Sequence, residues 1–533
     1  METGSNSPTT TQVAKSAGSV GIAVFFSRIL GLIREQVMAV LFGAGTYMDA
    51  FVVAFRVPNL LRDLFAEGAL SAAFVTVFTD FDQKKGPEAT WRLANNVLLT
   101  LTLLLSLITI LGMIFSEEII LVMAPDFDRV QGKIALTQLL TNIMFPFLIL
   151  ISVAAVVMGI LNTKGLFFMP AMASTFFNLG SIVGGVLCAW WAPSFGQPPI
   201  VGMAVGTLIG GFLQLAIQLP SLKGCGFEWR PHLNLKDEGL RRIMVLMIPA
   251  VIGLSATQIN IFINTNFAAR CAEGSVSWLN YAFRLMQFPI GIFGVAISIA
   301  TLPVISRQAS QGDMGALKST YVSSLTMAFF LTIPASFGLA FLAKPIIRLI
   351  FEYGRFNAQD TLHTAEALSY YAIGLFAYSS IKITVPVFYA LKDTRYPVIA
   401  SFLAVITNII VISIFLDSFQ HKAIAFSTSI TTIFNFIFLS TVLYKKVGGY
   451  DLRYLLSSLS KVILASLLMG FLASYLYQGI GLILNQRSLL NQIVSLFLVI
   501  TLAGLSYFIL VRWMGIQEIN EVMGSLKKRF LKS

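Results

Sequence analysis

The chain has 533 residues, of which 56% are hydrophobic and only 12% charged, and its mean hydropathy is +0.80. A soluble domain carries about twice that charged fraction, so these values exclude a soluble globular protein and indicate a polytopic membrane protein. The net charge of +12 does not point to nucleic-acid binding, because no basic run is long or interleaved with aromatic residues in a soluble segment.

Apolar runs of roughly 20 residues or more recur along the chain, and we count about fourteen of them. The Ser- and Thr-rich residues 1–16 come first; they are expected to form a polar cytoplasmic tail, and they lack the basic and apolar regions of a signal peptide. We then predict an all-α fold whose membrane helices lie at residues 17–42, 49–81, 91–116, 134–162, 170–192, 200–221, 243–269, 276–305, 320–343, 361–391, 396–416, 422–444, 457–479 and 488–512.

The first two predicted helices carry four arginines: Arg28 and Arg34 in the first, Arg56 and Arg62 in the second. Placing a guanidinium at the bilayer centre costs at least about 2.5–3.5 kcal/mol, so such residues usually face a wet cavity or a partner. We therefore expect these arginines to line a cavity that holds an anionic substrate, which is typical of a transporter.

Pairing of charges within each helix is the alternative interpretation. At about 100° per residue, opposite charges share one stripe of each helix: Asp49, Arg56, Asp63 and Glu67 on the second, and Arg28 with Glu35 on the first. Arg34 and Arg62 lie about 120° from these stripes, which favours ligand or interhelical contacts. Asp49 follows a Gly-Ala-Gly break, where a carboxylate can cap exposed amides or act in gating, and Glu67 is a second gating candidate.

The later part of the chain repeats short motifs of the earlier part. Ala54-Phe55-Arg56 recurs as Ala282-Phe283-Arg284, an offset of 228 residues, and a second match places Pro170 and Pro397 at 227. We predict six-helix lobes at residues 17–221 and 243–447, a basic linker at 222–242, two extra helices at 448–513 and a basic tail at 514–533. An even number of helices in each lobe makes the repeats parallel, which suits alternating access. Lys382 is a further cation within a span, where it could face the cavity or snorkel to the surface.

The distribution of basic residues predicts the orientation. If the amino terminus is cytoplasmic, about 23 of the 37 Lys and Arg fall on the cytoplasmic side and about eight on the other. Both termini are therefore expected to be cytoplasmic. The three histidines, His232, His363 and His421, lie far apart at or near loops, so no metal and no cofactor is assigned.

Several segments together resemble the MurJ (MviN) family of lipid II flippases. In the first half they are SRILGLIRE (residues 27–35), FGAG (42–45), DAF (49–51), PNLLR (58–62) and FAEGA (65–69). In the second half they are NYAFRLM (280–286) and PIIRLIFEYGR (345–355), so the resemblance covers essentially the whole chain in order.

The resemblance implies the fold of the multidrug/oligosaccharidyl-lipid/polysaccharide (MOP) exporter superfamily: two six-helix bundles around a cavity and two helices forming a lipid groove. It implies translocation of the undecaprenyl-diphosphate-linked disaccharide-pentapeptide, lipid II, to the outer leaflet of the bacterial cytoplasmic membrane. Carried over from the matching positions, Arg28, Arg34, Arg62 and Arg284 are candidates for diphosphate binding, and Asp49, Arg56, Glu67 and Lys382 for the cavity or gating. The expected partners are lipid II and membrane lipids, with cell-wall synthesis proteins as candidates; the expected state is a monomer.

Two departures from the family pattern stand out. Phe283 occupies a position where many relatives carry an acid before the arginine. Residues 243–269 contain no acid, although some members build a sodium site there, and hard cations are normally held by at least one carboxylate. This argues against sodium coupling and leaves the membrane potential as the candidate driver.

Two other classes of function remain as alternatives. An enzyme acting on the same lipid should show an acidic metal motif or a His/Ser constellation at the membrane surface, and neither is found. Another MOP exporter, for a lipid-linked polysaccharide or a drug, is the second alternative. A pump for cationic drugs would favour acids and aromatics in its cavity, so the arginines argue against that version.

Overall fold

The computed structural model describes residues 10–64, 69–485 and 488–515. Over these ranges all regular secondary structure is helical, which confirms the predicted all-α class. Within them, 11 segments are long and apolar enough to cross a membrane, or up to 12 if one bent pair forms a single span. The predicted number of fourteen spans stays a prediction.

The chain divides into two compact units, Met1–Gly274 and Ser275–Ser533. The first unit contains α1 (Thr10–Phe42), α2 (Thr46–Arg62), α3 (Ala69–Lys84), α4 (Gly86–Ile114), α5 (Ser116–Met123), α6 (Lys133–Met144), α7 (Phe147–Thr163), α8 (Phe168–Trp191), α9 (Ile200–Ala216), α10 (Leu219–Gly224) and α11 (Glu238–Ala269), with short 3₁₀ turns at Pro125–Arg129 and Ala192–Phe195. This unit includes the whole predicted linker and the seventh predicted helix. The lobe boundaries at 221 and 243 stay predictions.

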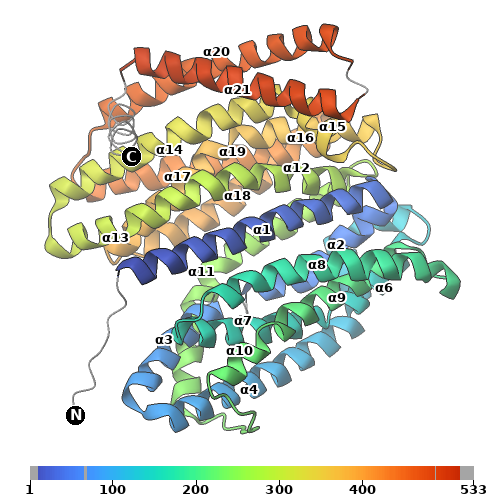
Figure 1. Cartoon of the computed structure of the whole chain (residues 1–533), viewed down its shortest axis with the longest axis vertical. Helices are drawn as coiled ribbons and strands as arrows, with labels where there is room; N and C mark the ends of the chain where they lie inside the picture. Colours follow the sequence, from blue (N-terminus) through green and yellow to red (C-terminus); the bar gives the residue numbers. More distant parts are fainter. Residues whose placement is uncertain (1–9, 65–68, 486–487, 516–533) are drawn as a thin grey trace. The chain divides into compact units, whose positions relative to one another are not determined.

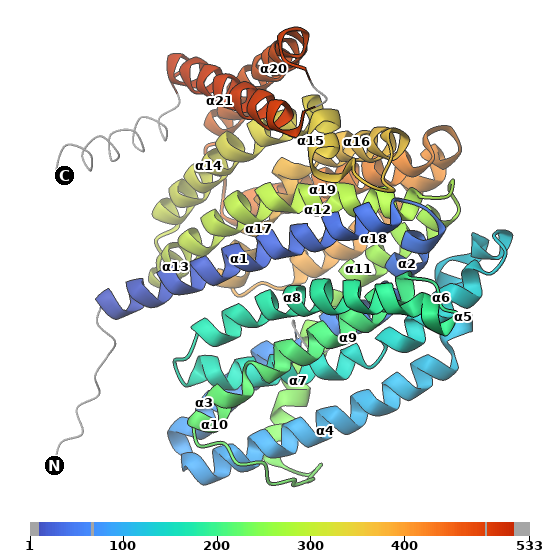
Figure 2. The same ribbon diagram turned by 45° about the vertical axis from the view of Figure 1, so that its right-hand side comes forward.

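The second unit contains α12 (Ser275–Pro289), α13 (Val295–Gln311), α14 (Met314–Phe341), α15 (Ala343–Phe351), α16 (Ala358–Ile373), α17 (Leu375–Ala390), α18 (Arg395–Phe419), α19 (His421–Lys446), α20 (Leu452–Ile483) and α21 (Leu489–Trp513). One π-helical turn, Ile290–Gly294, joins α12 to α13. The last two helices pack on each other and, through α14 and α15, on the rest of this unit (Figure 2).

Helix packing repeats between the units. In the first unit α2 packs on α6, α3 on α7, α4 on α7 and α6 on α9. In the second unit α12 packs on α16, α13 on α17, α14 on α17 and α16 on α19. Because each pair has its counterpart about one repeat later in the chain, the packing supports the duplication that the sequence matches predict.

Several predicted continuous helices are interrupted. Pro146 separates α6 from α7, Pro289 ends α12 before the π-helical turn, and α16 meets α17 at Gly374 with a bend of 42°. A proline removes a backbone donor and crowds the preceding turn, which explains the first two breaks. The predicted helix 49–81 contains α2, which ends at Arg62, and α3, which begins at Ala69; residues 65–68 between them lie outside the described residues.

The basic linker is attached to α4 by two asparagines. The Asn95 side chain donates to the Glu228 carbonyl at 3.0 Å and accepts from the Arg230 N–H at 2.9 Å. The Asn96 side chain donates to the Asn234 carbonyl and accepts from the Asn234 backbone N–H, each at 2.9 Å. Both asparagines are buried, so the linker backbone replaces water as their hydrogen-bond partner.

Glycines allow α8 and α9 to approach closely, and Figure 1 shows these two helices side by side. Gly202, Gly206 and Gly210 recur every fourth residue on α9, a spacing that places small residues on one helix face. A Cβ atom added at Gly206 would lie 2.3 Å from the Gly185 Cα and 2.8 Å from the Ser181 carbonyl oxygen. The backbones of both helices therefore meet at this position.

Gly206→Ala is expected to destabilise the protein by about 1–3 kcal/mol or more, because the added methyl meets backbone that cannot move alone. The midpoint of thermal unfolding of the purified protein in detergent would measure this. Gly253→Ala on α11 is the matched control, since a Cβ there meets no atom within 4 Å. Equal midpoints for the two variants would contradict the close packing of α8 and α9.

Candidate functional site

Arg34 lies on α1 next to a buried carboxylate. Its Nη2 donates to Oε1 of Glu35 at 3.0 Å, and its guanidinium carbon is 5.4 Å from the centre of the Phe177 ring on α8. A guanidinium carries five N–H donors, so these contacts orient the group without engaging all of its donors. Arg28, nearly two turns earlier on α1, is exposed.

Asp49 forms an ion pair in the interior of the first unit. Its Oδ2 accepts a hydrogen bond from Lys133 Nζ at 3.1 Å and another from the Gly274 backbone N–H at 2.9 Å. Only 2% of the Asp49 side chain and 4% of the Lys133 side chain are exposed. The ammonium also lies 4.0 Å from the centre of the Phe127 ring, so an aromatic face covers it. Asp49 therefore connects α2, α6 and the end of the first unit.

Lys133 is a residue that the sequence analysis missed. It is the first residue of α6, and the predicted helix 134–162 places it just outside the membrane, among the loop cations. Gly132 has a left-handed backbone (φ 79°) and directly precedes α6. The helix therefore begins one residue earlier than the hydropathy pattern predicts. That glycine is the only local signal, and it predicts a helix start rather than a partner for Asp49.

A second contact joins the same two ends of the first unit. Glu273 accepts hydrogen bonds from the Thr46 backbone N–H at 2.8 Å and from the Thr46 hydroxyl. The hydroxyl bond in particular holds the pKa of the exposed Glu273 carboxyl below its usual value, while burial opposes this shift. Asp49 and Glu273 together attach the segment after α11 to the start of α2.

This contact predicts a small pH-dependent term in stability. Because the folded-state pKa of Glu273 is depressed, its contribution is present above the unfolded pKa and is lost as pH falls through the folded pKa. Thr46→Val should cost about 1 kcal/mol or less at pH 7, given the solvent exposure. The gap in unfolding midpoint between wild type and variant should narrow as the pH falls below the unfolded pKa of glutamate, about 4.3, and through the lower folded-state pKa.

Thr441→Val is the matched control, since that hydroxyl donates to the Ile437 carbonyl of its own helix and to no acid. Its effect should not change with pH. A Thr46→Val gap that is equally large at pH 3 and pH 7 would contradict the role of the Glu273 charge.

The end of α2 carries the next arginine of the predicted site. Arg62 donates to Asp63 Oδ1 through Nη2 at 2.8 Å and through Nε at 3.1 Å, and Gln258 of α11 lies 3.4 Å from Asp63 Oδ2. Arg56 is half-buried about two turns earlier on α2. Glu67, the other gating candidate, falls outside the described residues.

Arg284 and Lys382 belong to the second unit. Arg284 is half-buried on α12, and the neighbouring Phe283 ring packs edge-on against Tyr371 at 5.5 Å between centres. Lys382 on α17 has an exposed side chain, while its backbone carbonyl accepts from the Ser298 hydroxyl at 2.6 Å. Many relatives are expected to carry an acid at this position. In this chain Phe283 makes an aromatic contact there instead.

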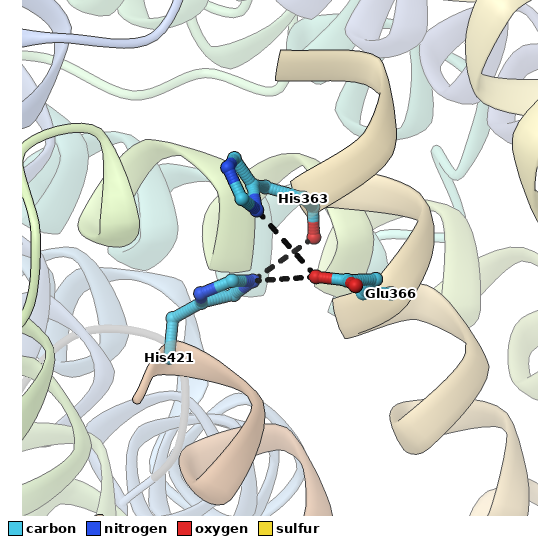
Figure 3. A group of neighbouring side chains, drawn as sticks. All are labelled: His363, Glu366 and His421. Carbon is cyan, nitrogen blue, oxygen red and sulfur yellow. Dashed lines mark hydrogen bonds and ion pairs between the residues drawn. The ribbon is translucent and has the colours of Figure 1, made fainter. Parts of the chain in front are cut away.

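The structure also brings together two of the histidines that appear unrelated in the sequence. His363 and Glu366 of α16 and His421 of α19 offer ligand atoms that all lie within 4.8 Å of one another (Figure 3). This is a group of metal-ligating side chains in the second unit, and it shares no residue with the candidate arginines. Helix order alone does not predict it, because 55 residues separate Glu366 from His421.

Comparison with known protein families gives a single answer over most of the chain. The family described as "Lipid II flippase MurJ" matches residues 38–500. The chain is 34% identical over 502 residues to the probable lipid II flippase MurJ of Buchnera aphidicola subsp. Acyrthosiphon pisum, covering 94% of this chain and 97% of that protein. It is 34% identical over 448 residues to the corresponding Vibrio cholerae protein, covering 83% and 84%.

Solved structures give the same result for the fold. A structure described as lipid II flippase MurJ in an inward closed conformation has a TM-score of 0.74 and 29% identity, covering 91% of this chain and 97% of that one. An inward-facing multidrug transporter of the MATE family in the MOP superfamily has a TM-score of 0.65 at 15% identity, covering 79% and 94%. The second similarity concerns the fold alone.

Proposed function

This chain belongs to the MurJ family of lipid II flippases, and we propose that it moves lipid II from the inner to the outer leaflet of the bacterial cytoplasmic membrane. The observation that carries the proposal is similarity to proteins named as lipid II flippases over nearly the full length of both chains. Relatives named in this way are transporters and not enzymes.

The finer proposal concerns the arginines. A diphosphate presents several anionic oxygens, and the planar fork of a guanidinium binds such groups through paired, charge-assisted hydrogen bonds. We assign this contact to Arg28, Arg34, Arg62 and Arg284. The contacts of Arg34 with Glu35 and Phe177 support this role, because they hold a charged group in place before substrate arrives.

We propose alternating access as the mechanism, with Asp49, Arg56, Glu67 and Lys382 in cavity or gating roles. The repeated packing of α2–α9 and α12–α19 supports it, since transporters built from repeats commonly move one repeat against the other. The proposed organisation remains two lobes, 17–221 and 243–447, with both termini cytoplasmic. We further propose that the protein acts as a monomer in contact with lipid II and membrane lipids. Cell-wall synthesis proteins are its candidate protein partners.

The test is leaflet accessibility of lipid II in cells where this gene is the only flippase gene and its expression can be stopped. A membrane-impermeant reagent should label the precursor while the protein is present and lose access after depletion. If the precursor stays accessible after depletion, and the protein exports a lipid-linked polysaccharide or a drug, the lipid II assignment fails and another MOP exporter activity replaces it.

A further inference from the structure

The residues His363, Glu366 and His421 form a compact ligand set in the second unit. Nδ1 of His363 lies 3.5 Å from Oε2 of Glu366, and Nε2 of His421 lies 3.9 Å from the same oxygen. His363 and Glu366 are three residues apart on α16, which places them on one face of the helix. His421 reaches the same point from the first residue of α19 (Figure 3).

These distances are close to those of an occupied tetrahedral site. Zinc bonds to nitrogen and oxygen of about 2.0–2.2 Å place neighbouring ligand atoms about 3.3 Å apart. The two distances in the structure, 3.5 and 3.9 Å, exceed this value by about 0.2 and 0.6 Å, and the ligand atoms of all three residues lie within 4.8 Å of one another. Side-chain rotations are enough to close these gaps.

Surrounding groups hold the two imidazole rings in place. The Trp278 ring of α12 lies 4.3 Å from the His363 ring and 5.1 Å from the His421 ring, between centres. The Trp278 indole N–H donates to Asp360 at 2.9 Å, and Asp360 in turn closes a capping box with Asn357 at the start of α16. A tryptophan anchored in this way fixes the rings from a third helix, as the outer shell of a metal site does.

The donor set selects the type of ion. Two imidazoles and one carboxylate suit Zn²⁺ and similar transition metals, whereas Mg²⁺ and Ca²⁺ prefer oxygen ligands throughout. The His421 side chain is 5% exposed, whereas His363 and Glu366 keep 26% and 33% of theirs exposed. One side of the ion would thus be closed by protein and the other open for water as a fourth ligand.

Two features oppose the ion and limit its affinity. Lys422 Nζ lies 3.6 Å from Oε1 of Glu366 and competes for the carboxylate. His421 Nε2 also lies 3.1 Å from the His363 carbonyl oxygen. Nε2 can bind a metal only in the tautomer that carries its proton on Nδ1. In that tautomer Nε2 no longer donates to the carbonyl, so the bond to the metal replaces this hydrogen bond.

We propose that His363, Glu366 and His421 bind one Zn²⁺ or a chemically similar transition-metal ion, which ties α16 to the start of α19. The proposal uses only residues of the second unit and is independent of the flippase assignment. By the predicted topology the site lies at the extracytoplasmic ends of both helices, where ions outside the cytoplasm reach it.

The test uses the full-length protein in detergent, with any histidine tag removed and metals stripped by a chelator. Titration with Zn²⁺ in a calorimeter should show one ion per chain, and Co²⁺ should give the visible absorption of a site with nitrogen ligands. The midpoint of thermal unfolding should rise with Zn²⁺ and not with Mg²⁺.

His363→Ala and Glu366→Gln should each weaken Zn²⁺ binding at least about 100-fold, since losing even an outer-shell partner costs about 10–100-fold. His232→Ala is the matched control, because that histidine is exposed in the linker and should leave binding unchanged. Lys422→Ala should tighten binding, since it removes the competing ammonium. The proposal is overturned if wild type binds no stoichiometric Zn²⁺, or if His363→Ala binds it as tightly as wild type.

Discussion

Replacing Arg34 or Arg284 with alanine is expected to leave lipid II trapped in the inner leaflet at matched protein expression. Each guanidinium would make charge-assisted hydrogen bonds with the diphosphate, and such a bond contributes about 1.5–3 kcal/mol. Losing one should therefore lower the rate of flipping roughly 10- to 100-fold. Labelling of the precursor by a membrane-impermeant reagent in cells with no other flippase measures this rate.

Two further variants separate a specific role from a general effect of charge. Arginine to lysine at the same positions keeps the charge but loses the planar fork, so flipping should be intermediate. Arg92→Ala is the matched control, since Arg92 is exposed on α4 and pairs with Glu88 one turn away. If alanine at position 34 or 284 leaves labelling at the wild-type level, the arginines do not carry the diphosphate.

Lys133→Met is expected to destabilise the first unit by about 3–5 kcal/mol, because the Asp49 carboxylate would remain buried without its ammonium partner. The double variant Asp49→Asn with Lys133→Met should recover much of this loss, since it leaves no unpaired charge in the interior. The unfolding midpoints of the purified proteins in detergent, compared in one cycle of variants, give the coupling between the two residues.

Arg129→Ala is the control for this cycle. Arg129 pairs with Asp126 at 3.1 Å, but 73% of its side chain is exposed, and exposed pairs contribute about 0–1 kcal/mol. If Lys133→Met unfolds at the same temperature as wild type, or if the double variant is no more stable than Lys133→Met, the buried pair does not have the energetic role assigned to it.

Helix periodicity did not predict several of the charge contacts in the first unit. Counting 100° per residue places Asp49 and Asp63 on one stripe of the predicted second helix, but this count does not predict the contact of Asp49 with Lys133 or that of Asp63 with Arg62. Arg34 and Arg62, expected to reach beyond their own helices, donate to the carboxylates next to them in the chain. Long side chains bend along the helix surface, so an ideal helical wheel does not decide their partners.

The amino-acid sequence by itself determined the class of this protein, its family and the presence of many long apolar helices. A long apolar helix can be predicted to lie in lipid without knowing which helices surround it, because a helix satisfies its own backbone hydrogen bonds. Gly132, Pro146 and Pro289 explain the helix boundaries next to them, since glycine and proline act on the local backbone.

Only the tertiary structure decided which side chains meet across helices. Lys133 and Asp49 are 84 residues apart, and Glu366 and His421 belong to helices separated by two others in the chain. A single sequence carries the spacing of residues within a helix but not the rotation and depth at which two helices pack. The buried ion pair and the histidine cluster therefore follow from helix packing and not from any local pattern.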